Sequence, residues 1–361
     1  MTRAVVEVDL AAVRANARRL VHVAGGSELW AVVKADGYGH GAVACARAAL
    51  AAGAERVCCA TLSEARELRE ALGEAVAVIV LSPLEPGEEA GAGGFEIVVS
   101  SLEDYGRLRA SGVGCDVHVK ADTGMGRWGM TPADALATGR ELAAGAGSLR
   151  LAGLMSHLAT SDDDPAFAAV QTAAFDDLAR AFPPCPRHLA NSAAALTLPG
   201  TRHDAVRCGI ALYGISPFGD AAARYGLTPA LRWSSHVAGL RELAPGASAG
   251  YGRRLIADRR VRIASVPVGY ADGYPRLLSG RADVLVGGRR CRVAATVSMD
   301  QLTCVVGDAV ALGDEVVLIG EQAGERVTAE ELAVHAETIA YEIVCATALA
   351  ARRGTRVAIG A

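Results

Sequence analysis

Lys34 ends an apolar run in the segment LWAVVKADGYGHG (residues 29–41), and a glycine-rich turn that contains Tyr38 follows directly. A primary amine at the tip of a buried strand can attack a carbonyl and form an imine. The same amine can also extend into solvent while its methylene stem packs on apolar neighbours. The segment alone leaves both interpretations open, so other parts of the chain must decide between them.

A second segment, VRCGIALYG (residues 206–214), predicts a seat for a phosphate group. Gly209 and Ile210 offer backbone N–H groups at a turn, and Asn191 and Ser192 supply polar side chains from the preceding unit. Convergent backbone N–H groups bind phosphate well. Gly209 taken alone serves tight packing equally well, but Arg207 stands two residues before it.

Together, the lysine, the phosphate seat and Arg207 are the groups needed to bind pyridoxal 5'-phosphate. The lysine forms an imine with the cofactor's aldehyde, and the arginine faces the pyridine nitrogen. Because a guanidinium group stays protonated, it can only donate to that nitrogen and leaves it largely unprotonated. The ring is then a weaker electron sink, which favours simple proton exchange at Cα over transamination.

Tyr251, in the segment SAGYGRRL, is the candidate for a second base in the C-terminal part of the chain. A glycine-flanked turn lets a phenol project into a neighbouring site, although a tyrosine between glycines is more often a packing residue. A phenol with its ordinary pKa near 10 is a poor base at neutral pH. Positive charge on His157 and Arg207 is expected to activate it.

The segment GMGRWG (residues 124–129) matches the dinucleotide-binding pattern G-x-G-x-x-G. However, the turn ADT separates the preceding strand from these glycines, and the next strand ends at Ser156 and His157. A dinucleotide site needs an acidic side chain there to bind a ribose hydroxyl. The sequence therefore disfavours a nicotinamide cofactor and favours Arg127 as an anion clamp.

Alternating short apolar runs and helix-periodic stretches place these residues on a (β/α)8 barrel of the TIM type. The expected strands lie at residues 29–33, 56–60, 76–81, 96–99, 116–120, 151–156 and 187–190. Residues that follow the strands of such a barrel gather at one mouth. They are Lys34, Tyr38, Lys120, Arg127, Ser156, His157, Asn191, Ser192, Arg207, Gly209 and Ile210.

Beyond about residue 228, β-rich runs separated by Gly, Pro and Asp turns predict a mostly antiparallel β domain. One helix is expected near the C-terminus, with Thr328 as its cap and Gly354 as its stop. The predicted domains are a barrel of residues 1–228 and a β domain of residues 229–361 that supplies the second base.

Composition predicts a cytoplasmic enzyme without nucleic-acid or membrane partners. Lys plus Arg number 36 against 40 for Asp plus Glu, so no overall positive field attracts polyanions. Charged residues interrupt the apolar runs near the N-terminus, where neither a signal-peptide core nor a spanning helix is expected. The nine cysteines have no CxxC spacing and the eight histidines are dispersed, so no metal site is expected.

The motifs together resemble those of the alanine racemase family, which are pyridoxal-phosphate enzymes of fold type III. The matching segments are AVVKADGYGHG, VKADTGMGRWG, SHLAT, HLANSAAAL, VRCGIALYG, GYGR, VGYADGYPR, VSMDQ and IAYEIVC. They run over almost the whole chain. The resemblance implies a homodimer with shared active sites that interconverts L-alanine and D-alanine by two-base proton exchange, supplying D-alanine for peptidoglycan.

The resemblance also implies a role for each site residue. Lys34 is the imine-forming lysine and the acid/base on one face of the substrate, and Tyr251 is the opposite base, reaching the other subunit's site. The residues implied to contact the cofactor are Lys34, Tyr38, Arg127, His157, Asn191, Ser192, Arg207, Gly209, Ile210 and Tyr341. Those implied to contact the substrate are Arg127, Met299 and Asp300, and Tyr270 is implied to crowd the access channel.

Three features qualify the resemblance. Lys120 stands where some family members carry a carbamate that orients the arginine, and an unmodified ion-pairing lysine is the alternative. Asp36-Gly37 replaces a common Asn-Ala pair, and AGYG replaces a frequent serine before Tyr251. Tyr341 favours alanine as substrate, because related serine racemases often lack a tyrosine at that position.

Two other function classes remain open alternatives. A decarboxylase of the same fold shares the barrel, the β domain and the lysine, but usually places an acidic residue where Arg207 stands. A non-catalytic cofactor-binding protein of the single-barrel type has no counterpart for residues 229–361. Both are therefore less favoured than a racemase.

Overall fold

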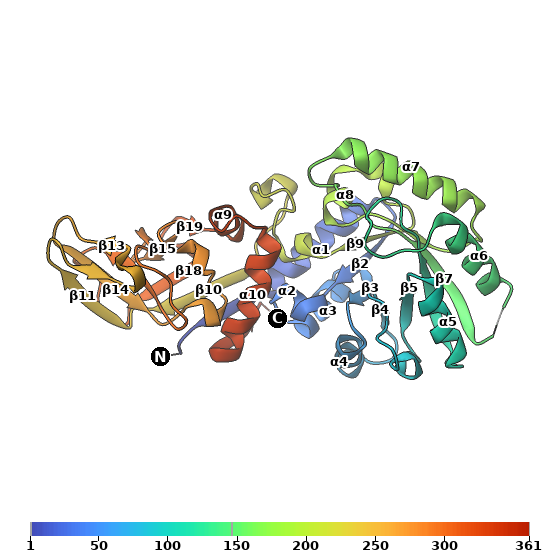
Figure 1. The fold of residues 1–361 in the computed structure, drawn as a ribbon, viewed down its shortest axis with the longest axis horizontal. Helices are drawn as coiled ribbons and strands as arrows, with labels where there is room; N and C mark the ends of the chain where they lie inside the picture. The colour runs from blue at the N-terminus through green and yellow to red at the C-terminus, as the bar shows by residue number, and fades with distance from the viewer. Residues whose placement is uncertain (1, 146, 361) are drawn as a thin grey trace.

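The computed structural model describes residues 2–145 and 147–360, which form an elongated molecule with a barrel at one end and a β-rich part at the other (Figure 1). Eight strands close into the barrel, and every neighbouring pair in it is parallel. This confirms the predicted barrel. The strands are β2 (Glu28–Val32), β3 (Ala54–Cys59), β4 (Ala77–Val80), β5 (Glu96–Val99), β6 (Cys115–Lys120), β7 (Leu149–Met155), β8 (Arg187–His188) and β9 (Ala205–Cys208).

Helices alternate with the strands along the barrel, and their ends follow local sequence signals. Thr61 caps α4 through the N–H of Glu64, whose carboxylate bonds back to Thr61, and Asn191 caps the short helix α8. The helices are α1 (Leu10–Ala24), α2 (Lys34–Tyr38), α3 (Ala42–Ala51), α4 (Leu62–Leu72), α5 (Leu102–Ala110), α6 (Pro132–Ala143), α7 (Pro165–Ala181) and α8 (Ser192–Thr197).

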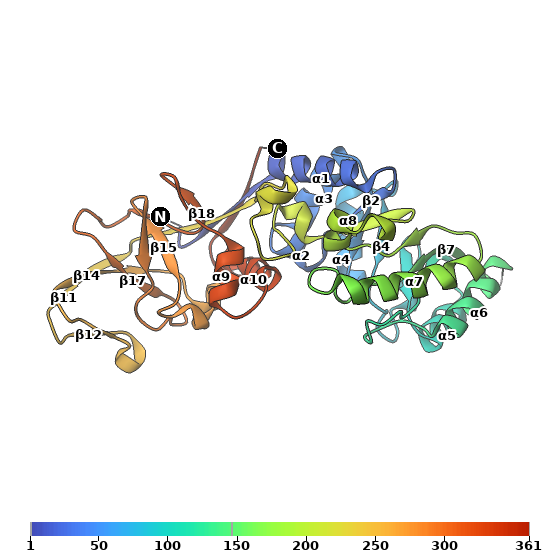
Figure 2. The same cartoon turned by 90° about the horizontal axis from the view of Figure 1, so that it is seen from above.

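The β-rich part is mostly antiparallel, as predicted, and contains a seven-stranded sheet, a three-stranded sheet and a two-stranded hairpin. Its strands are β10 (Leu231–His236), β11 (Gly239–Leu243), β12 (Ser248–Ala249), β13 (Leu255–Ile256), β14 (Val261–Val266), β15 (Asp283–Val286), β16 (Arg289–Arg292), β17 (Leu302–Val306), β18 (Glu315–Gln322), β19 (Glu325–Val327) and β20 (Thr355–Ile359). The β12–β13 hairpin lies at the end of the molecule away from the barrel (Figure 2).

The first strand of the chain, β1 (Val5–Asp9), lies in the seven-stranded sheet rather than in the barrel. It pairs antiparallel with β10 and parallel with β20, the last strand. The predicted division at residue 228 does not anticipate this pairing, because β1 has no neighbour in sequence that marks its partner. β1 therefore ties the chain's beginning to its end and leads directly into α1.

The prediction of a single C-terminal helix is wrong, because the structure has two helices there. They are α9 (Ala329–His335), capped by Thr328, and α10 (Ala340–Arg353), ended by Gly354, and they meet at an angle of 107°. Glu337 between them has φ of 55°, which no helix interior allows. Over residues 2–145 and 147–360, no single helix is long and apolar enough to cross a membrane, although this bent pair meets the length and composition criteria when joined.

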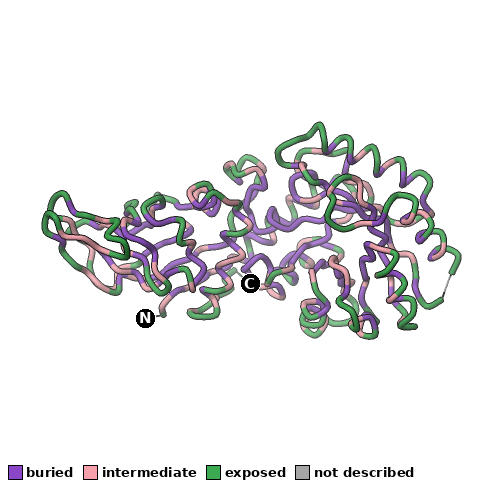
Figure 3. Tube along the Cα trace, in the orientation of Figure 1, coloured by how far each residue is buried: buried purple, intermediate pink, exposed green. Residues whose placement is uncertain are grey.

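One hydrophobic core extends from the barrel into the seven-stranded sheet, so buried residues run along most of the molecule (Figure 3). Trp30 of β2 and Trp233 of β10 are among its largest fully buried side chains. A small second cluster, centred on Leu243, Ala257 and Ile263, lies beneath the hairpin end. The continuous core fixes the barrel relative to the sheet.

Candidate active site

A cavity of about 570 Å³ opens at the C-terminal ends of the barrel strands, where active sites of this fold are built. The structure brings eleven of the predicted site residues together in its wall. They are Lys34, Tyr38, Lys120, Arg127, His157, Asn191, Ser192, Arg207, Gly209, Ile210 and Tyr341. Residues from five loops and from α10 thus converge on one space, as the strand pattern predicts.

Lys34 enters this cavity from a strained turn directly after β2. Residues 35–38 all have positive φ, between 52° and 61°, although only one of the four is glycine. The Glu64 carboxylate accepts the Ala35 N–H at 2.7 Å, and the Asp36 carboxylate accepts the Ala42 N–H at 3.2 Å. Backbone strain of this kind persists only where its surroundings enforce it, and it is frequent at active sites.

Gly39 completes the turn by letting α10 approach closely. A Cβ atom at Gly39 would lie 2.3 Å from the Val344 carbonyl oxygen of α10. This contact fixes the first turn of α10 beside the cavity, and there Tyr341 stands with its ring centroid 6.0 Å from that of Tyr38. Tyr341, the second residue of α10, therefore reaches the cavity wall just after the break between α9 and α10.

The cavity wall is strongly cationic. Lys34, Lys120, Arg127 and Arg207 all line it, and among the described lining residues Glu342 alone is acidic. Burial and the charge of Arg127 lower the pKa of Lys34, and burial together with Arg207 and Arg127 lowers the pKa of Lys120 to about 8. A site of this charge suits a dianionic phosphate and a carboxylate.

Lys34 and Lys120 are the only two lysines in the 361-residue chain, and all other basic side chains except histidine are arginine. Both lysines lie in the cavity. Arginine can replace lysine wherever only positive charge is needed, but it cannot form an imine or a carbamate because its guanidinium stays protonated. Both lysines of this chain therefore lie in the wall of the candidate site, where each supplies a primary amine that arginine could not replace.

Arg207, 4% exposed, is held by an almost complete set of hydrogen bonds. Its Nη1 group donates to the His188 carbonyl oxygen at 2.7 Å and to His188 Nδ1 at 2.9 Å. Its Nη2 group donates to the carbonyl oxygens of Ser156 at 2.8 Å and Leu189 at 3.2 Å. Among the described residues, only the Nε–H of this guanidinium lacks an acceptor, so it is the donor left for a ligand.

His157 lies beside this arginine, with Nδ1 3.3 Å from Arg207 Nη2. Burial and the positive charge of Arg207 hold the pKa of His157 well below its usual value, so the ring is neutral at pH 7 and accepts at Nδ1. The expectation of positive charge on both His157 and Arg207 is therefore met for Arg207 only, whose pKa of about 10 keeps it charged. A neutral imidazole beside a ligand ring packs against it without adding another positive charge to the wall.

The predicted phosphate seat forms around Ser192 and Gly209. The Ser192 hydroxyl oxygen accepts the Gly209 N–H at 3.0 Å, which leaves the hydroxyl proton free to donate. A Cβ atom at Gly209 would lie 2.4 Å from the Tyr38 hydroxyl oxygen, so glycine is required there. Asn191 lines the same wall, but its side-chain oxygen already accepts the N–H of Ala194 at 3.0 Å.

The glycine-rich loop of residues 124–129 does not form a dinucleotide site. Its N–H groups turn inward, and the Asp122 carboxylate accepts those of Gly124 and Met125 at 2.8 Å each and that of Gly126 at 2.9 Å. These donors are therefore not free to bind a pyrophosphate. Although burial opposes its ionisation, these bonds hold the pKa of Asp122 below its usual value. The loop instead carries Arg127 to the cavity.

Four predicted site residues lie outside this cavity, on the β-rich part. Tyr251, on the short 3-10 turn Tyr251–Arg253 between β12 and β13, is 74% exposed, and Met299 is 54% exposed. Tyr270 is 40% exposed. Asp300 is bonded to Arg353 at 2.6 Å. Within one chain, the candidate bases Lys34 and Tyr251 are therefore not brought together.

Family models match nearly all of the chain. A model of the alanine racemase N-terminal domain matches residues 8–217, and a model of the alanine racemase C-terminal domain matches residues 230–355. The chain belongs to the alanine racemase family. The two matches divide at the passage from the barrel into β10.

Bacterial alanine racemases align over almost the whole chain. That of Symbiobacterium thermophilum is 45% identical over 354 residues, which cover 94% of this chain and 93% of that protein. The crystal structure of alanine racemase from D-cycloserine-producing Streptomyces lavendulae has a TM-score of 0.93 at 40% identity and covers 100% of this chain and 98% of that one. The structure from Bartonella henselae, which has covalently bound pyridoxal phosphate, gives 0.89 at 28% identity, covering 99% and 100%.

These relatives establish the reaction. The chain is an alanine racemase, an isomerase that interconverts L-alanine and D-alanine. The alanine racemase family depends on pyridoxal phosphate, and its usual role is to supply D-alanine for peptidoglycan.

Sequence reasoning missed a polar group inside the racemase barrel, formed by Trp30, Glu96, His118 and His188. His118 and His188 are fully buried and hydrogen-bonded to each other at 3.0 Å. Their position was available from strand periodicity, because His118 stands two residues before Lys120 and therefore faces the same side of β6. A histidine inside an apolar strand, two positions before a site residue, is the signal that would have identified them.

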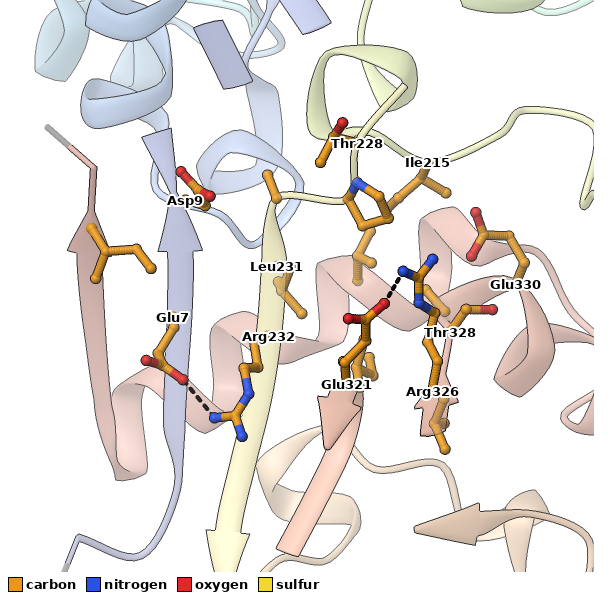
Figure 4. Close-up of a pocket in the computed structure, with 18 residues that line it drawn as sticks. Glu7, Asp9, Ile215, Thr228, Leu231, Arg232, Glu321, Arg326, Thr328 and Glu330 are labelled. Carbon is orange, nitrogen blue, oxygen red and sulfur yellow. Dashed lines mark hydrogen bonds and ion pairs between the residues drawn. The ribbon is translucent and has the colours of Figure 1, made fainter. Parts of the chain in front are cut away.

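A second cavity, of about 310 Å³, lies between the seven-stranded sheet and the start of α9 (Figure 4). Two ion pairs line it, Glu7 with Arg232 at 2.7 Å and Glu321 with Arg326, together with the carboxylates of Asp9 and Glu330. None of the predicted racemase residues lines it in the described part of the chain. The barrel-mouth cavity is therefore the candidate active site.

Proposed function

We propose that the barrel-mouth cavity binds pyridoxal 5'-phosphate on Lys34, and that Lys34 and Tyr251 exchange the Cα proton of alanine on opposite faces. The observation that carries this proposal is that the chain's only two lysines both line one cationic cavity, with Lys34 on a strained turn at a strand tip. When bound, the cofactor supplies a carbonyl that links to amines and a ring that withdraws electrons from Cα.

The chain's own residues fit each end of this cofactor. The free Nε–H of Arg207 is a donor for the pyridine nitrogen, and Arg127 for the phenolic oxygen. The phosphate is assigned to Tyr38, Ser192, Tyr341 and the N–H group of Ile210, while Gly209, whose N–H donates to the Ser192 hydroxyl oxygen, orients that hydroxyl in the seat. His157, neutral and beside Arg207, packs on the ring, and Asn191 supports the seat by capping α8.

Racemisation requires a base on each face of Cα, because one base returns the proton to the face from which it came. Burial and the charge of Arg127 lower the pKa of Lys34, so its amine gives up a proton more readily than an ordinary lysine does. The exposure of Tyr251 at the hairpin favours a phenol that enters the site of a second copy of the chain. We therefore propose a homodimer in which each site uses Lys34 of one subunit and Tyr251 of the other.

The substrate pocket is assigned to residues from both copies. Arg127 is proposed to bind the substrate carboxylate, together with the backbone N–H of Met299 and with Asp300 beside it. Tyr270 and Tyr341 are proposed to narrow the access channel and the space for the side chain, which selects a methyl group. The 54% and 40% exposures of Met299 and Tyr270 support a role at a subunit contact.

Lys120 is proposed to carry a carbamate. Its pKa of about 8 leaves a neutral amine that can attack carbon dioxide, and loss of a proton then leaves a carboxylate. The new negative charge would face Arg127 and Arg207 in a wall whose described lining residues include four cationic side chains and one acidic residue, Glu342. We further assign the enzyme to the cytoplasm, which the free thiols of all nine cysteines support.

Borohydride reduction of the holoenzyme tests the lysine assignment sharply. Reduction makes the link between cofactor and lysine permanent, and a protease that cleaves after lysine has only two sites in this chain. We expect the cofactor's mass on Lys34 and loss of cleavage there. Lys120→Ala should keep the tag, and Lys34→Ala should lose it together with the visible absorbance. A tag on Lys120 would refute the proposal.

Tyr251→Phe tests the second base. We expect racemisation to fall by roughly 10²–10⁴-fold, the usual contribution of a general acid or base, with the cofactor's absorbance intact. In D₂O the variant should still exchange the Cα proton of one enantiomer through Lys34. Tyr105→Phe, on the outer helix α5, is the matched control and should keep full activity. Equal exchange of both enantiomers by Tyr251→Phe would exclude this tyrosine as a base.

A further inference from the structure

A continuous hydrogen-bonded chain leads from Arg207 through the barrel interior. Arg207 Nη1 lies 2.9 Å from His188 Nδ1, His188 Nε2 lies 3.0 Å from His118 Nδ1, and His118 Nε2 lies 2.8 Å from Glu96 Oε2. We call Arg207, His188, His118 and Glu96 the histidine chain. Glu96 is the first residue of β5, so the chain ends at the face of the barrel opposite the active site.

Arg207, the first residue of the histidine chain, fixes the donor and the acceptor of every hydrogen bond in it. A guanidinium group only donates, so His188 must accept at Nδ1 and carry its proton on Nε2. That proton is donated to His118 Nδ1, so His118 in turn carries its proton on Nε2. The last proton is donated to a carboxylate, which only accepts. Because Arg207 can only donate and Glu96 can only accept, the rings of His188 and His118 can each adopt only one tautomer.

The charge states of Arg207, His188 and Glu96 are consistent with these hydrogen-bond directions. Burial lowers the pKa of Arg207 to about 10, which still leaves the guanidinium charged at pH 7. Burial and the charge of Arg207 hold the pKa of His188 well below its usual value, so this ring stays neutral. Although burial opposes ionisation of Glu96, the bonds from His118 and Arg56 lower its pKa. The far end is thus a stable acceptor.

Packing holds the two rings in place. The Trp30 ring lies 4.4 Å from that of His188 and 5.6 Å from that of His118, and the rings of the two histidines meet edge to face at 87°. Gly153 of β7 leaves room for the chain, because a Cβ atom there would lie 2.4 Å from His118 Nδ1. Arg56, which also pairs with Glu28, holds Glu96 from the other side at 3.3 Å.

We propose that His188, His118 and Glu96 are positioning residues that lock the Arg207 guanidinium in one orientation, with its Nε–H facing the active-site cavity. This inference rests on the proposed function in one respect, namely that Arg207 faces the cofactor ring. If His188 carried its proton on Nδ1, two N–H groups would oppose each other and Arg207 would lose that bond. The orientation of an active-site arginine is therefore set from the opposite face of the barrel.

The tautomers can be read directly by long-range ¹H–¹⁵N NMR on holoenzyme with ¹⁵N-labelled histidine. We expect His188 and His118 each to carry one proton, on Nε2, as the bond from Arg207 requires. Spectra of His188→Gln and His118→Gln assign the two signals. A charged ring or an Nδ1–H tautomer at either position would overturn the proposal. This readout needs no turnover, so it stands apart from any failure of the proposed cofactor chemistry.

Variants of His118 test the positioning role. His118→Leu leaves the His188 Nε2–H without an acceptor, so we expect His188 to lose its single tautomer. The kcat should fall roughly 10- to 100-fold, the worth of one charge-assisted hydrogen bond, with KM for alanine changed less than about threefold. His118→Gln, whose amide can accept and donate in the same directions, should restore kcat to within about threefold of wild type.

Two further variants complete the test. His203→Leu removes another largely buried histidine, one that pairs with Asp176 and has no bond to Arg207, and it should leave kcat and the His188 signal unchanged. Glu96→Leu removes the last hydrogen-bond acceptor of the histidine chain. It should reproduce the loss of kcat even where His118→Leu does not fold. Wild-type kcat and an unchanged His188 tautomer in Glu96→Leu would refute the proposal that the histidine chain positions Arg207.

Discussion

At the scale of single residues, the site depends on which positions keep a lysine. In a chain with two lysines and many arginines, positive charge alone does not explain either lysine. Lys34 stands on a strained turn where it can form a covalent link, and Lys120 stands 3% exposed among other cations. Their shared cavity concentrates amine chemistry that arginine cannot perform.

Lys120 should form a carbamate whose extent rises with pH. Because its pKa is about 8 rather than the usual 10.5, about a tenth of the amine is neutral at pH 7, and more than half becomes neutral above pH 8. Carbon-13 NMR with labelled bicarbonate should show one carbamate resonance that strengthens from pH 7 to pH 8.5. Lys120→Met should abolish it, and a resonance that survives this substitution would place the modification elsewhere.

Gly209→Ala should weaken cofactor binding at least tenfold. The new Cβ atom would lie 2.4 Å from the Tyr38 hydroxyl oxygen and would displace the tyrosine from the phosphate seat. Absorbance titration of the cofactor-free protein measures the dissociation constant. Gly200→Ala is the matched control, because a Cβ atom at Gly200 would meet nothing within 4 Å and affinity should not change. Equal affinities for the two variants would show that Tyr38 is not needed for phosphate binding.

At the scale of elements, carboxylate side chains hold the loops that follow the barrel strands. Asp122 gathers three N–H groups of the loop after β6, and Glu64 holds the turn after β2 from the first turn of α4. These contacts are all made between residues of one chain. The site is therefore largely preorganised, which reduces the entropy that binding must offset.

Asp122→Ala should raise the KM for alanine about 5- to 10-fold, because the freed loop no longer holds Arg127 at the cavity. We also expect a loss of about 1–2 kcal/mol in the free energy of unfolding, measured by urea denaturation, from the three lost hydrogen bonds. Asp134→Ala, which removes an acidic residue from the first turn of α6, should cost up to about 1 kcal/mol without changing KM. An unchanged KM in Asp122→Ala would separate the loop from substrate binding.

Sequence pattern predicts the elements of the barrel well, because each strand is a short apolar run between helix signals. The expected strand at 96–99 is reproduced without change, and the strand at 116–120 differs by one residue. The β8 strand is shorter than expected, since it ends at His188, and Leu189 and Ala190 lead into the segment that carries Asn191 and Ser192 to the cavity wall. The break at Glu337 was missed, because apolar periodicity continues across it and only the backbone angles reveal the turn.

At the scale of the whole molecule, the sequence could not predict features that depend on pairing between strands far apart in the chain. The partnership of β1 with β10 and β20 joins residues more than 220 positions apart, and no local pattern marks it. The cavity residues follow from the barrel's geometry, because strand ends converge in any such barrel. Tyr251 lies on the turn between β12 and β13. Strand β12 is at the end of the molecule away from the barrel (Figure 2), a position that follows only from the arrangement of the two parts.

Mixing two inactive variants should restore activity if the site is shared between subunits. Lys34→Ala and Tyr251→Phe homodimers each lack one base in both sites. A heterodimer of the two has one site with neither base and one site with both. At full statistical exchange, about a quarter of wild-type activity should return, because half of the dimers are mixed and each has one intact site. Chiral analysis of alanine measures the recovery, and native mass spectrometry confirms the exchange. No recovery in a sample with proven mixed dimers would mean that Lys34 and Tyr251 do not act in one shared site.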